Sequence, residues 1–249
     1  MKKLLLTAGL FFLPWVAHAG TITTSFSPLG TITIASGTAA GGGGTGGTYT
    51  YIQTARSNAN TYTNTLAFGA GITAHSTLII GCTASKSGNY LAITDNNSNT
   101  AYSTATFINN TNNTVGTGIY YTPNANAGAT SVTCVDTTHT ATWVQLELSE
   151  YGTTAGGTFD VAVASAPATS VTVNSSGNMS TTVNNEFVYS FVSDYGSALT
   201  SESGTLRDSY ANNVYMATQD TVVSSASPYA STFTCASGSK SSTLQAAFK

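Results

Sequence analysis

The chain has 249 residues, of which only 7% are charged and 41% are hydrophobic, and its formal net charge is −3 at pH 7. Ordinary globular domains carry about 25% charged residues. So few cations cannot form the basic patch that nucleic acid or an anionic membrane surface requires, and the composition argues against both partners.

The chain begins with an export signal. Two lysines precede the apolar run Leu4–Val16, and Ala17-His18-Ala19 supplies the small-x-small pattern that a signal peptidase cleaves. The apolar run is too short to span a bilayer, which takes about 20 residues. We therefore expect cleavage of residues 1–19 before Gly20, no membrane span in the mature chain, and a secreted or cell-surface location. The mature chain keeps five cations and ten acids, a formal charge of −5.

Residues 20–47 form a separate N-terminal strand segment and linker. Between Thr21 and Ser36 the large apolar residues Ile22, Phe26, Ile32 and Ile34 fall on even positions and the odd positions are mostly Thr and Ser, as in one or two strands broken near Pro28 and Gly30. The glycine-rich run up to Gly47 has a reach of roughly 18 Å if it behaves as a flexible coil. Such a tethered strand can pair with its own sandwich, be donated to a neighbouring subunit, or stay disordered. We expect the first outcome, and the pairing residues are Ile22, Phe26, Ile32 and Ile34.

Residues 48–249 show almost no helical periodicity. Short runs rich in β-branched and aromatic residues are separated by turns about every 8–12 residues, which is typical of a sandwich or a barrel. The predicted strands are 48–53, 61–68, 76–84, 90–94, 101–107, 117–121, 129–135, 141–150, 158–164, 170–173, 185–193, 213–218, 230–235 and 242–248.

This region contains an internal repeat. The stretch Ala129–Cys134 resembles Ala230–Cys235, and a polar turn and another strand follow in both places. Upstream, Ser76–Cys82 parallels Asn185–Phe191. We therefore expect an all-β, antiparallel β-sandwich domain (48–249) built from two similar halves, about residues 50–152 and 153–249, that pack face to face or interleave.

The three cysteines are spaced too widely for a zinc knuckle. Each shares its strand face with an apolar residue two positions earlier, so each is expected to be buried. We predict a Cys82–Cys134 disulfide within the first half, with Cys235 a buried thiol. The alternatives are a Cys134–Cys235 bridge between equivalent positions of the repeat, and three buried thiols.

Five blocks occur in a characteristic order: Thr77–Gly81, Ile93–Tyr102, Ile119–Ala129, Glu147–Gly152 and Leu244–Phe248. Together, over residues 51–249, they resemble an uncharacterised family of exported bacterial β-sandwich domains. This chain has Ser98 where that family has a turn glycine, and its fourth block is shortened. The resemblance implies a jelly-roll-like sandwich in secreted and surface proteins, and it brings no catalytic residues.

The run Asp95-Asn96-Asn97-Ser98-Asn99 begins like a calcium-binding loop. It lacks the central glycine, and Thr106 stands where the bidentate glutamate would be. Asp and Asn also favour turns because they hydrogen-bond their own backbone. We expect a hairpin turn here, with no metal and no cofactor.

Catalytic residues are not evident from the pattern. Glu147 and Glu150 are an odd number of residues apart and so face opposite sides of a strand, whereas glycoside hydrolysis needs two carboxylates across one cleft. We expect Glu147 to face solvent and Glu150 to lie at the end of the strand, next to a turn. His75 and His139 are expected to be lone surface histidines, which leaves a catalytic thiol without a convincing partner.

The 13 tyrosines could stack on sugar rings. Tyr120, Tyr189 and Tyr215 fall in apolar strands and are expected in the core, and Trp143 is the one mature tryptophan. The ligand candidates lie in predicted loops: Tyr195, Tyr210 and Tyr229. The sequence thus predicts a secreted, non-enzymatic protein with a structural, adhesive or self-assembly role, through self-association or a surface partner. The alternatives are a carbohydrate-binding module and, less favoured, a polysaccharide-active enzyme.

Overall fold

A computed structural model describes residues 46–86, 90–97, 99, 102–111, 114–154, 157–166, 170–196, 198–201 and 203–249, and the strands 23–26 and 30–33. Every regular element in these ranges is a β-strand, and the strand pairs are antiparallel. The predicted all-β, antiparallel class is confirmed. The chain divides into two units, residues 1–43 and 44–249.

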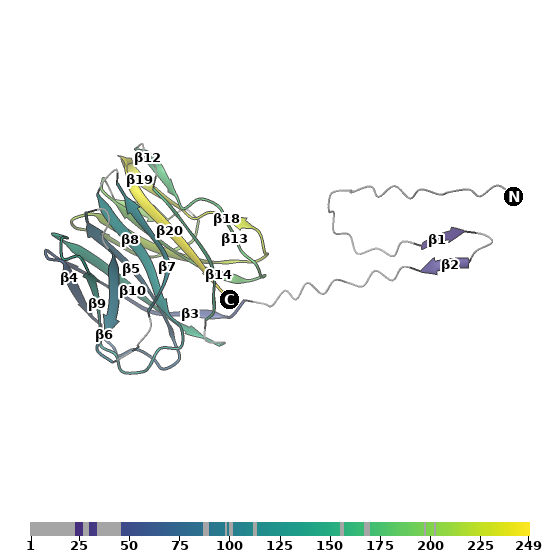
Figure 1. Ribbon diagram of the computed structural model, residues 1–249, viewed down its shortest axis with the longest axis horizontal. Helices are drawn as coiled ribbons and strands as arrows, with labels where there is room; N and C mark the ends of the chain where they lie inside the picture. The colour runs from purple at the N-terminus through teal and green to yellow at the C-terminus, as the bar shows by residue number, and fades with distance from the viewer. Residues whose placement is uncertain are drawn as a thin grey trace. The chain divides into compact units, whose positions relative to one another are not determined.

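The first unit contains a β-hairpin. Strands β1 (Thr23–Phe26) and β2 (Gly30–Thr33) pair with each other in a two-stranded sheet, with Phe26 opposite Gly30 (Figure 1). The predicted break near Gly30 therefore falls between two strands of one hairpin. The signal sequence, Ile22 and Ile34 lie outside the described residues, and pairing of this segment with a sandwich stays a prediction.

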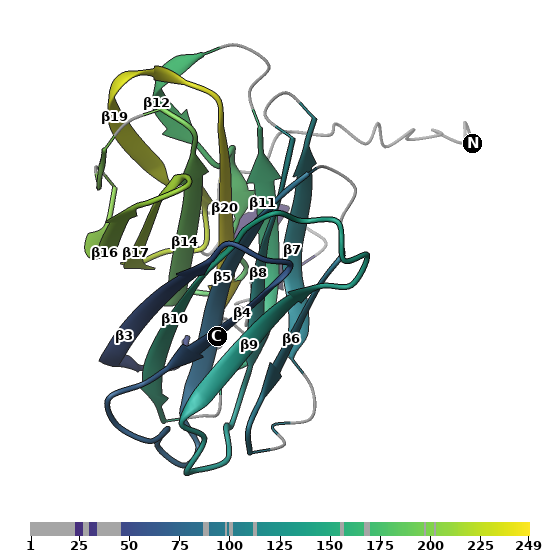
Figure 2. The same ribbon diagram turned by 90° about the vertical axis from the view of Figure 1, so that its left-hand side faces the viewer.

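The first part of the second unit supplies the strands of two sheets, which we call the first inner sheet and the first outer sheet. The first inner sheet has the order β3-β10-β5-β8-β7, and the first outer sheet has the order β4-β9-β6 (Figure 2). The strand bounds are β3 Tyr49–Ala59, β4 Thr63–Ala67, β5 Thr77–Ser85, β6 Leu91–Asp95, β7 Ser103–Asn110, β8 Val115–Thr122, β9 Ser131–Asp136 and β10 Val144–Thr153.

The remaining strands form a second inner sheet, β11-β20-β14-β17-β16, and a second outer sheet, β12-β19-β15, with a short β13-β18 pair. Their bounds are β11 Phe159–Ser165, β12 Val171–Ser175, β13 Met179–Ser180, β14 Glu186–Asp194, β15 Leu199–Ser201, β16 Thr205–Ala211, β17 Tyr215–Val223, β18 Pro228–Tyr229, β19 Thr232–Ser239 and β20 Ser241–Phe248.

The strand order recurs along the chain. The strands can be numbered from 1 to 8 twice, first from β3 to β10 and again from β11 to β20, with the two-residue strands β13 and β18 left out. Both inner sheets then have the strand order 1-8-3-6-5, and both outer sheets have the order 2-7-4. The four edge strands of the inner sheets each carry one extra residue in a β-bulge: Ile52, Ala105, Asp160 and Arg207. The bulged strands also occupy matching places in the two orders. This recurrence agrees with the internal sequence repeat.

Apolar side chains fill three layers between these sheets. One core cluster, with Ile80 and Leu146, lies between the first inner and outer sheets. A second, with Ile79, Phe191 and Met216, draws on both inner sheets, and we call this contact the seam. Smaller clusters lie between the second inner sheet and the strands that cover it. The central strands are therefore buried on both faces, which explains why β5 and β14 carry apolar residues on both of their faces.

Burial also corrects the predicted parallel between Ser76–Cys82 and Asn185–Phe191. Cys82 belongs to the cluster beneath the first outer sheet, whereas Phe191 belongs to the seam. The match is therefore off by one residue, which in a strand exchanges the two faces. Phe191 instead lies over Gly81, where an added Cβ would be 2.5 Å from its ring.

Candidate functional site

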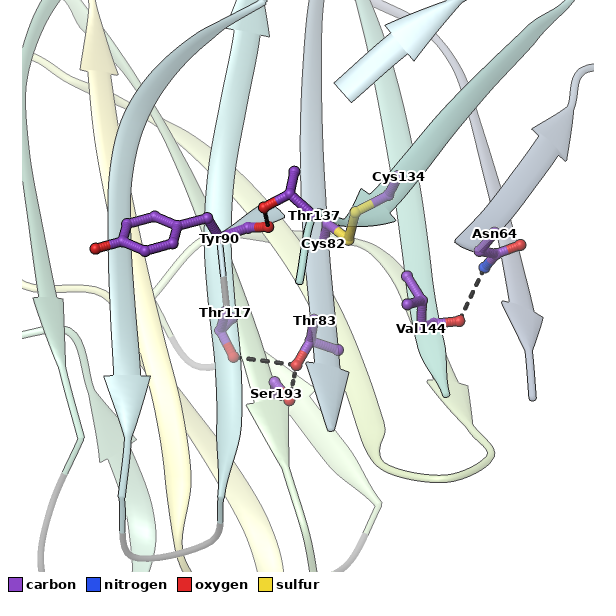
Figure 3. Close-up of a disulfide and its surroundings, with 9 residues drawn as sticks. All are labelled: Asn64, Cys82, Thr83, Tyr90, Thr117, Cys134, Thr137, Val144 and Ser193. Carbon is purple, nitrogen blue, oxygen red and sulfur yellow. Dashed lines mark hydrogen bonds between the residues drawn. A yellow bond between two sulfur atoms is a disulfide. The ribbon is translucent and has the colours of Figure 1, made fainter. Parts of the chain in front are cut away.

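The predicted disulfide is confirmed and ties two sheets together. Cys82 on β5 bonds Cys134 on β9, with the Cα atoms 6.7 Å apart, so the bond joins the first inner sheet to the first outer sheet (Figure 3). Cys235 is a buried thiol whose Sγ lies 3.3 Å from the carbonyl oxygens of Val171 and Thr172. The disulfide thus braces β9 two residues before the strand ends.

The loop after β9 is fixed by the last residue of that strand, Asp136. Its carboxylate accepts the backbone N–H groups of Thr138, Thr140 and Ala141 at 3.0, 2.8 and 2.7 Å. Burial alone would raise the pKa of Asp136, but the bonds from Ala141 and Thr138 outweigh it and lower the pKa. The ionised carboxylate therefore holds a rigid loop in which His139 adopts a left-handed backbone, with φ 56°.

Two exposed tyrosines flank this loop. Tyr62 precedes β4 and its carbonyl accepts the N–H of Asp136 at 2.8 Å; Tyr90 precedes β6 and its carbonyl accepts both the N–H and the hydroxyl of Thr137 at 2.9 Å. Tyr62 is 40% exposed and Tyr90 is 72% exposed. The ring of Tyr62 lies 4.4 Å from that of His139, and Figure 3 shows Tyr90 directed away from the disulfide. We call Tyr62, Tyr90, Thr137 and His139 the aromatic tip.

The aromatic tip is a feature of the first half of the domain. Its loop separates β9 from β10 by seven residues, 137–143, whereas Lys240 alone separates the corresponding strands β19 and β20. Where a repeated framework carries a longer loop in one copy, that loop is the natural place for a function specific to the copy. The sequence analysis missed Tyr62 and Tyr90; the available signal was that each directly precedes a strand flanking β9.

The three predicted ligand tyrosines lie on separate elements. Tyr195 follows β14 in a turn and is 54% exposed. Tyr210 lies within β16, with the guanidinium of Arg56 4.9 Å from its ring centre. Tyr229 lies in β18 and donates its hydroxyl to the carbonyl of Ser203 at 2.7 Å. The loop assignments of Tyr210 and Tyr229 were wrong, because both belong to strands without a strong apolar pattern.

Glu147 and Glu150 are both fully buried within β10, so the expected solvent-facing position of Glu147 and the expected turn-end position of Glu150 were wrong. Glu150 accepts the N–H of Thr73 at 2.7 Å and the amide of Gln53 at 2.5 Å. Glu147 faces the seam and accepts the hydroxyl of Thr218. The reason is that β10 lies between β3 and β5, in a sheet covered on both faces. Trp143 is likewise buried, in the seam cluster.

Charged groups join the two inner sheets across one side of the seam. Arg207, the bulge residue of β16, donates to both carboxylate oxygens of Asp220, at 2.6 and 2.9 Å, and Tyr151 of β10 donates its hydroxyl to the same carboxylate at 2.7 Å. The guanidinium of Arg207 also lies 4.4 Å from the ring centre of Tyr51 on β3. Arg56 on β3 pairs with Asp208 on β16.

Burial raises the pKa of Glu147 to about 7, although the hydroxyl of Thr218 and the charge of Arg56 lower it. Its second oxygen, Oε2, is buried and receives no hydrogen bond from the described residues. This carboxyl lies between packed sheets with no opening to solvent, since Glu147 has no exposed surface. Its carboxyl is therefore enclosed by the packed sheets.

The Asp95 loop serves as a connection between sheets. Asp95 Oδ1 accepts the N–H groups of Asn97 and Asn99 at 2.8 and 3.1 Å, and Oδ2 accepts the hydroxyl of Tyr102 at 2.8 Å. The expected hairpin was wrong, because β6 belongs to the outer sheet and β7 to the inner sheet. Within the described ranges, no three His, Cys, Asp or Glu side chains gather as a metal site.

Every acidic side chain that the structure describes is engaged within the fold. The carboxylates hold turns, join strands or cross the seam, and they belong to Asp95, Asp136, Glu147, Glu150, Asp160, Glu186, Asp194, Asp208 and Asp220. His75 is exposed and contacts the side-chain oxygen of Asn124 at 2.7 Å.

An open pocket of about 410 Å³ lies at the start of β3 and is lined by Gly46, Gly47, Thr48, Tyr49, Asn185 and Val222. Its lining carries no acidic or basic side chain. Across the described part of the chain, no helix has the length and apolar character needed to cross a membrane. Comparison with protein-family models, with curated proteins and with solved structures finds no match to this chain.

Proposed function

We propose that this chain is an exported, non-catalytic surface protein with a structural or adhesive role, and that it associates through its N-terminal hairpin. The observation that carries the proposal is the hairpin itself, a two-stranded sheet in a unit of its own. Two strands alone are marginally stable in water and need a further strand or a packed face. Association would bury the apolar residues of the hairpin, and this burial favours it.

The register of the hairpin supports this role. Thr24 pairs with Ile32 and Phe26 pairs with Gly30, so even positions stand opposite even positions and share one face. Ile22 and Ile34 continue the same pattern in the sequence. The bulged edges of both inner sheets disfavour addition of a strand there. The edge strands β4 and β6 of the first outer sheet pair without a bulge, and they are therefore better places for the hairpin to add a strand.

Sedimentation velocity of the mature chain over a concentration series tests this proposal. Phe26→Asp places a charge on the apolar face of the hairpin, and we expect it to weaken association at least tenfold. The matched control is Ser25→Asp, in the same strand on the other face, which should associate like the parent. Equal association of all three proteins, or a monomeric parent at every concentration, would remove the support for assembly.

The aromatic tip favours carbohydrate binding as a second candidate function. Exposed tyrosine rings stack on the apolar faces of sugars, and the hydroxyl of Thr137 and the imidazole of His139 add hydrogen-bonding groups beside them. The tip carries no acidic or basic side chain apart from His139, which suits a neutral glycan. Binding to a panel of soluble and insoluble polysaccharides tests this candidate, with Tyr90→Ala expected to weaken retention and Tyr195→Ala to leave it unchanged. If Tyr195→Ala weakens retention and Tyr90→Ala does not, the result would favour Tyr195, the binding residue predicted from the sequence. If the parent protein is not retained on any polysaccharide, both the aromatic tip and Tyr195 are rejected as sugar-binding sites.

A further inference from the structure

Three reactive side chains meet at one end of the second inner sheet. Asp160 lies on β11, Lys249 directly follows β20, and Glu186 begins β14, and these three strands are neighbours in the sheet. Asp160 is the bulge residue of its strand, between the paired residues Phe159 and Val161. A bulge re-aims the side chain of its extra residue. Here it directs the carboxylate toward the end of β20.

The amine and the carboxylate are already in contact. Lys249 Nζ lies 2.6 Å from Asp160 Oδ1, and the hydroxyl of Thr182 donates to Asp160 Oδ2 at 2.7 Å. The backbone of Lys249 is held in register by two bonds with Thr158, each 2.8 Å long. Asp160 is 6% exposed in its side chain and Lys249 is 37% exposed. The contact therefore joins a nearly buried acid to a positioned amine.

Glu186 supplies a third group beside this pair. It has no exposed surface, and its Oε2 accepts the N–H groups of Thr182 and Val183 at 3.0 and 3.3 Å. Its Oε1 is buried and receives no hydrogen bond from an N–H or O–H group of the described residues. Burial, followed by a hydrogen bond with Asp160, raises the pKa of Glu186 to about 7. Two carboxyls can share such a bond only when one carries a proton.

We propose that Lys249 and Asp160 form an intramolecular amide crosslink, with Glu186 as the acid beside it. Within the ion pair, the ammonium passes a proton to the Asp160 carboxylate, which leaves a neutral amine and a carboxylic acid. The Nζ lone pair attacks Cγ while the Glu186 hydroxyl polarises the acid oxygen. The N–C bond forms, Glu186 gives its proton to the departing hydroxyl as one C–O bond breaks and one water leaves, and the second proton lost by Nζ restores Glu186. No oxidant or activated co-reactant is consumed.

Proximity is what makes this condensation reasonable. Two reacting groups that a protein holds about 3 Å apart react as if each were present at a very high effective concentration. The crosslink would tie β11, the first strand of the second half, to the end of β20, its last strand. The first half already has a covalent tie in Cys82–Cys134, whereas in the second half Cys235 packs with Val192 instead of a second cysteine. The crosslink goes beyond the proposed function and does not depend on it.

Intact mass spectrometry of the reduced, unfolded mature protein tests the proposal. We expect the parent to be lighter than its sequence by one water molecule, and fragmentation to yield a branched peptide that contains Asp160 and Lys249. Lys249→Arg and Glu186→Gln should restore the full sequence mass, whereas Lys240→Arg should keep the loss. Circular dichroism of each variant establishes that it folds.

Two results would overturn the proposal. The first is a parent at its full sequence mass after prolonged incubation at pH values on both sides of 7, which would make the contact an ordinary ion pair. The second is a folded Lys249→Arg variant that still lacks one water, which would place the dehydration elsewhere in the chain. A loss that persists in folded Glu186→Gln but not in folded Lys249→Arg would keep the crosslink and remove the role assigned to Glu186.

Discussion

Glu147 should make the stability of the domain depend on pH. Its pKa is raised from 4.5 to about 7 in the folded protein, mainly by burial. The folded state therefore holds a proton that the unfolded state has released between these two pH values. Stability is greatest below pH 4.5 with respect to this group and falls as the pH rises toward 7.

The size of this effect follows from the shift. A difference of about 2.5 pKa units corresponds to about 3 kcal/mol, which is the cost of burying the charged form in the seam. Glu147→Gln is neutral at every pH and keeps an oxygen for the hydroxyl of Thr218. We therefore expect the variant to be more stable than the parent by up to about 3 kcal/mol above pH 7, and similar to it at pH 4.

Urea unfolding and thermal melts at the two pH values measure this difference. A gain of that size corresponds to a melting temperature higher by roughly 6–12 °C in a domain of this length. Glu150→Gln is the matched control, since Glu150 is equally buried on the same strand but accepts bonds from Thr73 and Gln53. A Glu147→Gln variant that is destabilised, or changed equally at both pH values, would refute the reasoning.

Three further predictions concern covalent and packing features. Replacing Cys82 and Cys134 by Ala should lower the free energy of unfolding by about 4 kcal/mol for a separation of 52 residues, as measured by urea unfolding beside the oxidised parent. Gly81→Ala should destabilise the seam by roughly 1–3 kcal/mol in the same assay, because its Cβ would meet the ring of Phe191. N-terminal sequencing of the exported protein should begin at Gly20, and retention of Leu4–Val16 would contradict export by cleavage.

Alternation and turn chemistry were sufficient to locate most strands. β5, β10, β14 and β20 contain regularly placed apolar residues, and each was predicted within a few residues of its observed bounds. β16 was missed because it is an edge strand with Arg207 at its bulge, so its polar sequence resembles a loop. Local pattern alone cannot show that a charged residue is directed across a seam.

Burial was the harder property to predict. An alternating strand normally has one wet face, so Glu147 was expected in solvent; packing of the inner sheets against each other covers that face. The aromatic tip was missed for a similar reason. Tyr62 and Tyr90 are 28 residues apart in the sequence and lie on either side of the β9 end only because β4 and β6 both pair with β9.

Removal of the hairpin tests the proposed function most directly. Light scattering of the mature chain and of a chain lacking residues 21–35 should be compared across the same concentration series. We expect the parent to associate with rising concentration, because its monomer would leave the hairpin's apolar residues in water at a cost of roughly 1.5–3 kcal/mol for each large side chain. The shortened chain has lost these residues and should remain monomeric. Identical scattering and identical melting of the two proteins would contradict association through the N-terminal hairpin.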